Sequence, residues 1–214
     1  MIWEYFSAII ISYLIGSIPS GLLIGRIVGK VDIREYGSGK IGFTNSLRTL
    51  GWRPSLAVLV LDAAKGYGPV MVTWAITGDH GVQVAAGLAA IIGHNWPALA
   101  GFRGGRGVAT TFGVFLGLNA PTALVLIAVA VALIYVFRFI SLVSIVIIPL
   151  ATLAFLSLTW AGYGPYTYPV FGACASLLII LQHRENIKRL LAGTEPRIGH
   201  GGQMRPAISP ESDG

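Results

Sequence analysis

Charged side chains are scarce in this chain, and their scarcity restricts the class of protein that it can be. Asp, Glu, Lys and Arg make up 11% of the 214 residues, whereas 54% of the residues are hydrophobic. Soluble domains carry roughly 25% charged residues. The polar surface is too small to cover a water-soluble globule of this size, so lipid must surround most of the chain. We therefore expect an all-α, polytopic membrane protein folded as a helical bundle.

Cysteine is almost absent as well. Cys174 is the single cysteine and lies in an apolar run, where packing accounts for it. One cysteine excludes a disulfide within the chain and a metal site built on several thiolates. No other cluster of metal-ligand residue types is evident, so the sequence predicts neither a metal site nor a bound cofactor.

Seven apolar runs approach the length of roughly 17–25 residues with which a helix crosses a bilayer. The fourth run is short and rich in glycine, and Pro19 blurs the first. We expect about seven transmembrane helices. The runs are Ile2–Ile24, Pro54–Ile76, Val82–Leu99, Val108–Leu118, Ala120–Phe137, Ile140–Trp160 and Tyr168–Leu181.

Basic residues are missing from one set of connecting segments. With the N-terminus outside, the outer segments 1–4, 77–81, 119–120 and 161–167 contain neither Lys nor Arg, and most of the cations fall in the inner segments. The positive-inside rule then predicts an N-terminus outside and a C-terminus in the cytoplasm. Cations confined to short loops also give no solvated basic face for nucleic acid.

Composition divides the chain into two parts. We expect residues 1–193 to form a single transmembrane domain. Residues 194–214 are rich in Gly, Pro, Ser and charge, which predicts a disordered cytoplasmic tail.

The first inner segment, residues 32–48, combines glycines with polar donors. Its glycines match G-x-G-x-x-G, but that pattern indicates dinucleotide binding only within a βαβ unit, which cannot fit between two membrane spans. Glycine lets backbone N–H groups approach an anion closely, which favours phosphate binding; a tight connecting turn is the alternative. The candidate residues are Gly37, Ser38, Gly39, Lys40, Gly42, Thr44, Asn45 and Arg48.

The second inner segment, residues 93–110, places two arginines around two glycines. Arginine offers forked donors that suit phosphate oxygens, and a helix beginning at Val108 would add free N–H groups and its dipole. Membrane anchoring explains the charges but not the glycines. His94 is either a base or a hydrogen-bonded loop residue. The candidates here are His94, Arg103, Gly104, Gly105, Arg106 and Gly107.

In the third inner segment, residues 183–195, His183 and Asn186 share one face of a helix. They point either into a site within the bundle or along an interfacial helix whose cations contact lipid head groups. Glu185, Arg189 and, from the region after Arg138, Ser141 complete the candidate binding residues.

Two charged residues fall inside a predicted span. Asp62 and Lys65 are three residues apart on one helix face, so mutual pairing is the simplest explanation. They are also expected to face the bundle interior near the site.

Together the three segments resemble the cytoplasmic motifs of the bacterial membrane-bound acyl-phosphate glycerol-3-phosphate acyltransferases. Residues 37–48, 93–107 and 183–186 match these motifs in order, and the similarity covers nearly all of the chain except its tail. The chain departs from the family pattern at four positions, where Asn, Ala, Lys and Lys are common: Lys40, Phe43, Arg103 and Arg106. The arginines keep the charge but change its geometry from a point to a fork.

The resemblance implies a reaction in which acyl phosphate and glycerol 3-phosphate give 1-acyl-glycerol 3-phosphate (lysophosphatidic acid) and phosphate. It implies a site on the cytoplasmic side of the bacterial inner membrane, with the soluble enzyme that makes acyl phosphate as a further partner. We expect His183 to be the base and Asn186 or Asn45 to stabilise the oxyanion, with Ser38 as a fourth catalytic candidate. The leaving phosphate is an alternative proton acceptor.

None of the four histidines is followed by Asp five residues later, so the His-x4-Asp chemistry of common lipid acyltransferases is excluded. A membrane transporter of a phosphorylated metabolite is the competing class. It would need polar residues deep in several spans and on the outer side, where the connecting segments carry no cations.

Overall fold

The computed structural model describes residues 2–198, and its regular elements confirm the predicted all-α class. Three short non-α helices are η1 (Gly25–Gly29), η2 (Ile33–Glu35) and η3 (Ala98–Ala100). The α-helices are α1 (Ile2–Gly16), α2 (Ser20–Ile24), α3 (Phe43–Leu50), α4 (Trp52–Thr77), α5 (His80–Asn95), α6 (Val108–Leu118), α7 (Ala120–Phe137), α8 (Ile140–Trp160), α9 (Thr167–Gln182) and α10 (Arg184–Leu191).

Helices occupy all seven apolar runs, and only the first and third differ from the predicted bounds by more than two residues. The first run is interrupted after Gly16, before Pro19, because proline lacks the N–H that a continuous helix needs. The third ends at Asn95 instead of Leu99, because Pro97 disfavours helical backbone in the residue before it.

Four segments are long and apolar enough to cross a membrane by length and composition: Ile2–Gly29, Trp52–Thr77, Ala120–Phe137 and Ile140–Trp160. Helices α5, α6 and α9 are shorter. The number of spans and the sides on which the termini lie therefore stay predictions.

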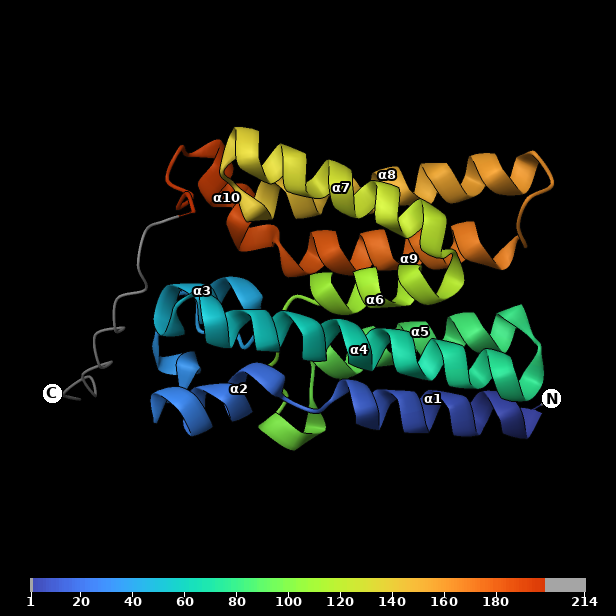
Figure 1. Cartoon of the computed structure of the whole chain (residues 1–214), viewed down its shortest axis with the longest axis horizontal. Coiled ribbons are helices and arrows are strands. Elements are labelled where there is room, and N and C mark those ends of the chain that lie inside the picture. The colour runs from blue at the N-terminus through green and yellow to red at the C-terminus, as the bar shows by residue number, and fades with distance from the viewer. Residues whose placement is uncertain (1, 199–214) are drawn as a thin grey trace, which may run out of the picture.

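The helices pack side by side with α6 near the middle of the bundle (Figure 1). Helix α1 packs on α5, α4 on α6, and α8 on α9. Helices α2, α3 and α10 lie toward the same end of the bundle, opposite the N-terminus (Figure 1). The short α6 begins further inside the bundle than the neighbouring ends of α4 and α9 (Figure 1), which brings the second inner segment into the interior.

Two glycines set the distance between α4 and α6. A Cβ added to Gly66 would lie 2.1 Å from the carbonyl oxygen of Thr110, and one added to Gly113 would lie 1.9 Å from that of Ala63. Each helix therefore presents a glycine to the other's backbone. This close approach holds α6, and the loop that precedes it, against the middle of α4.

Replacing Gly66 by Ala should lower the thermal midpoint of the protein in detergent, because a methyl group would overlap the α6 backbone at a cost of about 1–3 kcal/mol. Gly68, two residues along the same helix, has no atom within 4 Å of its added Cβ and provides the matched control. Gly68→Ala should leave the midpoint unchanged or raise it slightly. Equal effects of the two substitutions would contradict the role given to Gly66.

Candidate active site

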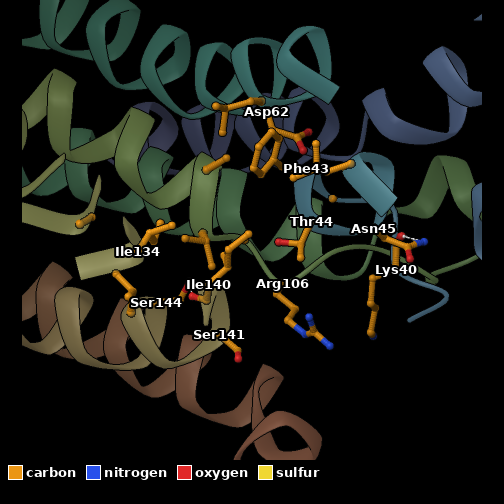
Figure 2. A pocket seen from close by; sticks show the side chains of 18 of the residues that line it. Lys40, Phe43, Thr44, Asn45, Asp62, Arg106, Ile134, Ile140, Ser141 and Ser144 are labelled. Atoms are coloured by element: carbon orange, nitrogen blue, oxygen red, sulfur yellow. Dashed lines mark hydrogen bonds between the residues drawn. The ribbon is translucent and has the colours of Figure 1, made fainter. Parts of the chain in front are cut away.

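The three inner segments converge on a cavity of about 770 Å³ at the end of the bundle that carries α3 and α10. The first segment reaches it through α3 and the preceding loop, the second through the loop before α6, and the third through α10. Figure 2 shows Arg106 extending into this cavity between Thr44 of α3 and Ser141 of α8. The predicted site residues that line it are Ser38, Lys40, Gly42, Thr44, Asn45, Arg48, His94, Arg106, Gly107, Ser141, His183, Asn186 and Arg189.

Six predicted site residues do not line the cavity. Gly37 and Gly39 have φ angles of 52° and 67°, so they shape the turn of the first segment. Gly104 and Gly105 are buried against the end of α5. Arg103 and Glu185 are exposed and lie outside this lining, so their predicted place in a substrate site stays a prediction.

The positions of the last two have local causes. The loop after α5 leaves the bundle at η3 and turns back only at Gly104, so Arg103 stays on its outer part. Glu185 lies on the outer face of α10, where its carboxylate is 3.4 Å from Lys188 Nζ and 3.7 Å from Arg184 Nε.

Three guanidinium groups meet at the mouth of the cavity: Arg48 from α3, Arg106 from the second segment and Arg189 from α10. Burial lowers the pKa of Arg106 to about 10, and the charges of Arg189 and Arg48 add to this effect. Burial and the charge of Arg189 also lower the pKa of Arg48. The mouth therefore holds cations at a distance where they repel one another, which favours an anion between them.

Glu195 is the carboxylate that faces these arginines, and sequence reasoning missed it. Its Oε1 accepts hydrogen bonds from Ser141 Oγ (2.7 Å) and Asn186 Nδ2 (2.6 Å), and its Oε2 accepts one from Arg189 Nε (2.7 Å). Burial raises the pKa of Glu195, but these three bonds outweigh it and hold the pKa below its usual value. Glu195 is thus ionised, and its hydrogen bonds to Ser141 of α8 and to Asn186 and Arg189 of α10 join these two helices.

The position of Glu195 corrects the predicted start of the tail. Residues 194–198 pack against the domain: the Pro196 carbonyl accepts from Arg48, Ile198 N donates to the Arg138 carbonyl, and the Arg197 guanidinium lies over the Phe139 ring. The prediction of disorder from residue 194 is therefore wrong for residues 194–198, because Glu195 is held by the buried side chains of Ser141 and Asn186. The rest of the predicted tail lies outside the described residues.

Asn45 holds the first segment in shape. Its Nδ2 donates to the carbonyls of Ile33 (2.7 Å) and Lys40 (2.9 Å), and its Oδ1 accepts from Ser38 N (2.9 Å). Both amide hydrogens are therefore used within the segment. This differs from the predicted role of Asn45 as an oxyanion donor and makes it the residue that shapes the loop.

The glycines of the second segment allow it to fold over the end of α5. A Cβ at Gly104 would lie 2.1 Å from the His94 carbonyl oxygen, and one at Gly105 would lie 2.0 Å from His94 Nε2. Gly107 has a φ of 82° and is followed by α6, which begins at Val108 as predicted. The close packing explains two of the glycines that we had expected to contact phosphate, while Gly107 and the start of α6 reach the cavity.

His183 ends α9 with its ring buried beside the cavity. Its Nδ1 lies 2.8 Å from the Ile179 carbonyl oxygen. A carbonyl oxygen can only accept, so Nδ1 carries the hydrogen and Nε2 keeps its lone pair. Burial and the charge of Arg106 lower the pKa of His183 to about 4, so the ring is neutral at neutral pH.

The predicted pairing of Asp62 with Lys65 is confirmed, with Lys65 Nζ 2.8 Å from Asp62 Oδ1. The same oxygen is 3.5 Å from His94 Nδ1. Asp62 and His94 both line the cavity, as their expected place near the site requires. Among residues 2–198, two carboxylates line the cavity, Asp62 and Glu195. Lys65 neutralises the first and Arg189 neutralises the second.

Beyond the polar mouth the cavity continues as an apolar slot. Its walls are stripes of residues three or four positions apart on four helices, so each stripe lies on one helix face. Figure 2 shows Ile134 and Ile140 on this side of the cavity. The apolar lining residues on these helices include Leu59, Val60 and Ala63 of α4, Ala109, Phe112 and Leu116 of α6, Ile127, Ala130, Val131 and Ile134 of α7, and Ile140, Val143 and Ile147 of α8.

Comparison with known proteins agrees with this arrangement. A family model described as glycerol-3-phosphate acyltransferase matches residues 6–193. A glycerol-3-phosphate acyltransferase of Parasynechococcus marenigrum (strain WH8102) is 44% identical over 189 residues, which cover 88% of this chain and 87% of the relative. One of Halalkalibacterium halodurans is 45% identical over 191 residues, covering 88% and 92%.

Two crystal structures of PlsY (YgiH), an integral membrane glycerol 3-phosphate acyltransferase, have the same fold. The glycerol 3-phosphate form has a TM-score of 0.82 at 40% identity and covers 91% of this chain and 96% of its own. The lysophosphatidic acid form has a TM-score of 0.80 at 38% identity and covers 92% and 96%. This chain is therefore an integral membrane protein that belongs to the glycerol-3-phosphate acyltransferase family.

Proposed function

We propose that this protein transfers an acyl group from acyl phosphate to the hydroxyl of glycerol 3-phosphate, giving 1-acyl-glycerol 3-phosphate and phosphate. The observation that carries the proposal is the joining of a three-arginine mouth to an apolar slot in one cavity. Both substrates carry phosphate, and the donor also carries an alkyl chain. The solved relatives named for their glycerol 3-phosphate and lysophosphatidic acid forms support the acceptor and the product.

Arg106 and Arg48 are the groups that we assign to the phosphates. The charge of Glu195 offsets part of theirs, but its hydrogen bonds go to Ser141, Asn186 and Arg189 and not to these two guanidinium groups. The Nε of Arg106 is buried without a hydrogen-bond acceptor in the described part of the chain. Guanidinium forks bind phosphate oxygens in pairs, and the start of α6 adds backbone N–H groups at the same place.

The slot would hold the first part of the acyl chain. Its stripes on α7 and α8 extend from Ile127 to Ile134 and from Ile140 to Ile147, which is about 10 Å of helix each. One leaflet of the hydrocarbon core is about 15 Å thick, so a membrane-length acyl chain is longer than the slot. The remainder would pass Val131, whose side chain is 61% exposed at the slot's edge, into the surrounding lipid.

The reaction needs proximity more than strong base catalysis, because acyl phosphate is already an activated anhydride. The glycerol hydroxyl oxygen attacks the acyl carbon, the bond from that carbon to the phosphate oxygen breaks, and phosphate leaves. His183 Nε2 would accept the hydrogen bond of the attacking hydroxyl and orient it. An imidazolium with a pKa near 4 does not keep a proton, so the proton passes to the leaving phosphate.

We place the site on the cytoplasmic side of the bacterial inner membrane. The arginine mouth lies at the end of the bundle where α2, α3 and α10 gather, and cations favour the cytoplasmic side (Figure 1). There the site would face soluble glycerol 3-phosphate and the soluble enzyme that supplies acyl phosphate. We propose that no metal takes part.

The proposal is tested with purified protein in detergent, given acyl phosphate and glycerol 3-phosphate. Release of phosphate with formation of lysophosphatidic acid, undiminished by a chelator, is expected. Acyl-CoA and acyl carrier protein loaded with the same chain should give no product. Product from these donors but not from acyl phosphate would contradict the donor; flux of a phosphorylated metabolite into liposomes without any product would favour a transporter.

Replacing His183 by Leu should lower kcat by about 100-fold or more, because an alkyl side chain has no lone pair to orient the hydroxyl. An NMR titration of labelled histidine should show the His183 ring neutral down to pH 5, with a midpoint near 4. Since Arg106 contributes to this lowering, Arg106→Ala should move the midpoint upward. Near-normal turnover of His183→Leu, or a midpoint at 6.5, would exclude this role.

Replacing Val131 by Trp should lower turnover of long-chain acyl phosphates by about tenfold, because the ring would fill the edge of the slot. Octanoyl phosphate should be affected much less. Val125, 63% exposed on the same helix but away from the slot, is the matched control, and Val125→Trp should stay within about twofold of the native protein. Equal losses for both variants, or for both chain lengths, would place the acyl chain elsewhere.

A further inference from the structure

The buried Asp62–Lys65 pair has no part in the mechanism above. Both side chains are almost fully buried near the middle of α4, one of the helices long enough to cross the membrane. Charged side chains inside a span are costly and usually serve a function. Apolar residues of similar volume often give equal or greater stability than a buried ion pair, so stability alone is a weak explanation.

Each member of the pair also reaches another segment. Lys65 Nζ donates to the carbonyl oxygen of Ile18 (2.8 Å), which lies in the interruption between α1 and α2. Asp62 Oδ1 is 3.5 Å from Nδ1 of His94, in the last turn of α5. The pair thus links three segments around the base of the second inner segment.

His94 in turn supports that segment. Its carbonyl oxygen accepts a hydrogen bond from Gly105 N (3.1 Å), and the ring is so close to Gly105 that an added Cβ would lie 2.0 Å from Nε2. The imidazole therefore packs directly against the Gly105 backbone. Arg106 follows directly, and its guanidinium extends into the cavity (Figure 2).

We propose that Asp62 is a positioning residue: by holding the His94 ring it fixes Gly105, and so sets the place of the Arg106 guanidinium at the cavity mouth. Lys65 neutralises the Asp62 carboxylate, which would otherwise repel the substrate phosphates from the cavity wall. The proposal rests on the proposed function, in which Arg106 binds a phosphate.

A double-mutant cycle with Arg106 tests the proposal. The double substitution Asp62→Ala with Lys65→Met removes both charges without adding bulk at a buried position, so no lone charge stays buried. Inorganic phosphate is the probe; its dissociation constant is measured by calorimetry, with the KM for glycerol 3-phosphate and the thermal midpoint. We expect the thermal midpoint to stay close to the native value. The dissociation constant for phosphate and the KM for glycerol 3-phosphate should each rise by about tenfold.

In an Arg106→Ala background the same double substitution should change phosphate binding by less than about twofold, because the group that it positions is gone. A loss as large as in the native background would show that the pair acts independently of Arg106 and would overturn the proposal. So would unchanged phosphate binding in the first background. If the double variant does not fold, Asp62→Asn, which changes little in volume, is put through the same cycle with the same criteria.

Asp79→Asn is the control carboxylate substitution. Asp79 caps the other end of α5, where its Oδ1 accepts hydrogen bonds from Gly81 N (2.7 Å) and Val82 N (3.0 Å). The substitution should leave phosphate binding unchanged. Failure of the proposed function would appear in the native protein, as absence of both phosphate binding and acyl transfer. A native protein that is active, with no coupling between Asp62 and Arg106, would overturn the positioning role alone.

Discussion

Repulsion among three partly buried guanidinium groups is the interaction on which the site depends. Arg48, Arg106 and Arg189 come from separate elements, and one carboxylate, Glu195, faces them. Burial is the main cause of the lowered pKa of Arg106, and the charges of Arg189 and Arg48 lower it further. A phosphate dianion that accepts paired hydrogen bonds from the guanidinium groups would reduce this repulsion. The fold therefore gives up some stability for a site that prefers such a ligand.

Helices α6 and α8 join this charged mouth to the apolar slot. Helix α6 begins at the mouth with free backbone N–H groups and presents Ala109, Phe112 and Leu116 to the slot. Helix α8 places Ser141 on Glu195 in its first turn and Ile147 deeper in the slot. A reacting acyl carbon would therefore lie where each helix changes from polar to apolar lining, with its phosphate on one side and its chain on the other.

Much of this arrangement could be predicted from the sequence, because helical runs and confined cations leave few alternatives. The apolar runs predicted the helices, and the distribution of cations predicted which connecting segments lie at the same end of the bundle. Glu195 was missed because its surroundings have the composition of a disordered tail, and only tertiary contacts with Ser141 and Asn186 reveal its role. Asn45 was assigned to chemistry, although its hydrogen bonds lie within its own loop.

Arg103 shows a limit of a different kind. It has the same residue type and almost the same surroundings in sequence as Arg106, but the path of the loop leaves one outside the cavity and the other inside. Composition cannot distinguish residues three positions apart on an irregular loop. The glycines around them were likewise assigned to phosphate, when two of them serve to pack the loop on His94.

A crystal structure of this protein with glycerol 3-phosphate tests the central claim most directly. The phosphate is expected between Arg48 and Arg106, within hydrogen-bond distance of both guanidinium groups, with the glycerol hydroxyl directed toward His183. A phosphate bound at the exposed Arg103, or anywhere that leaves Arg106 without an anion, would contradict it.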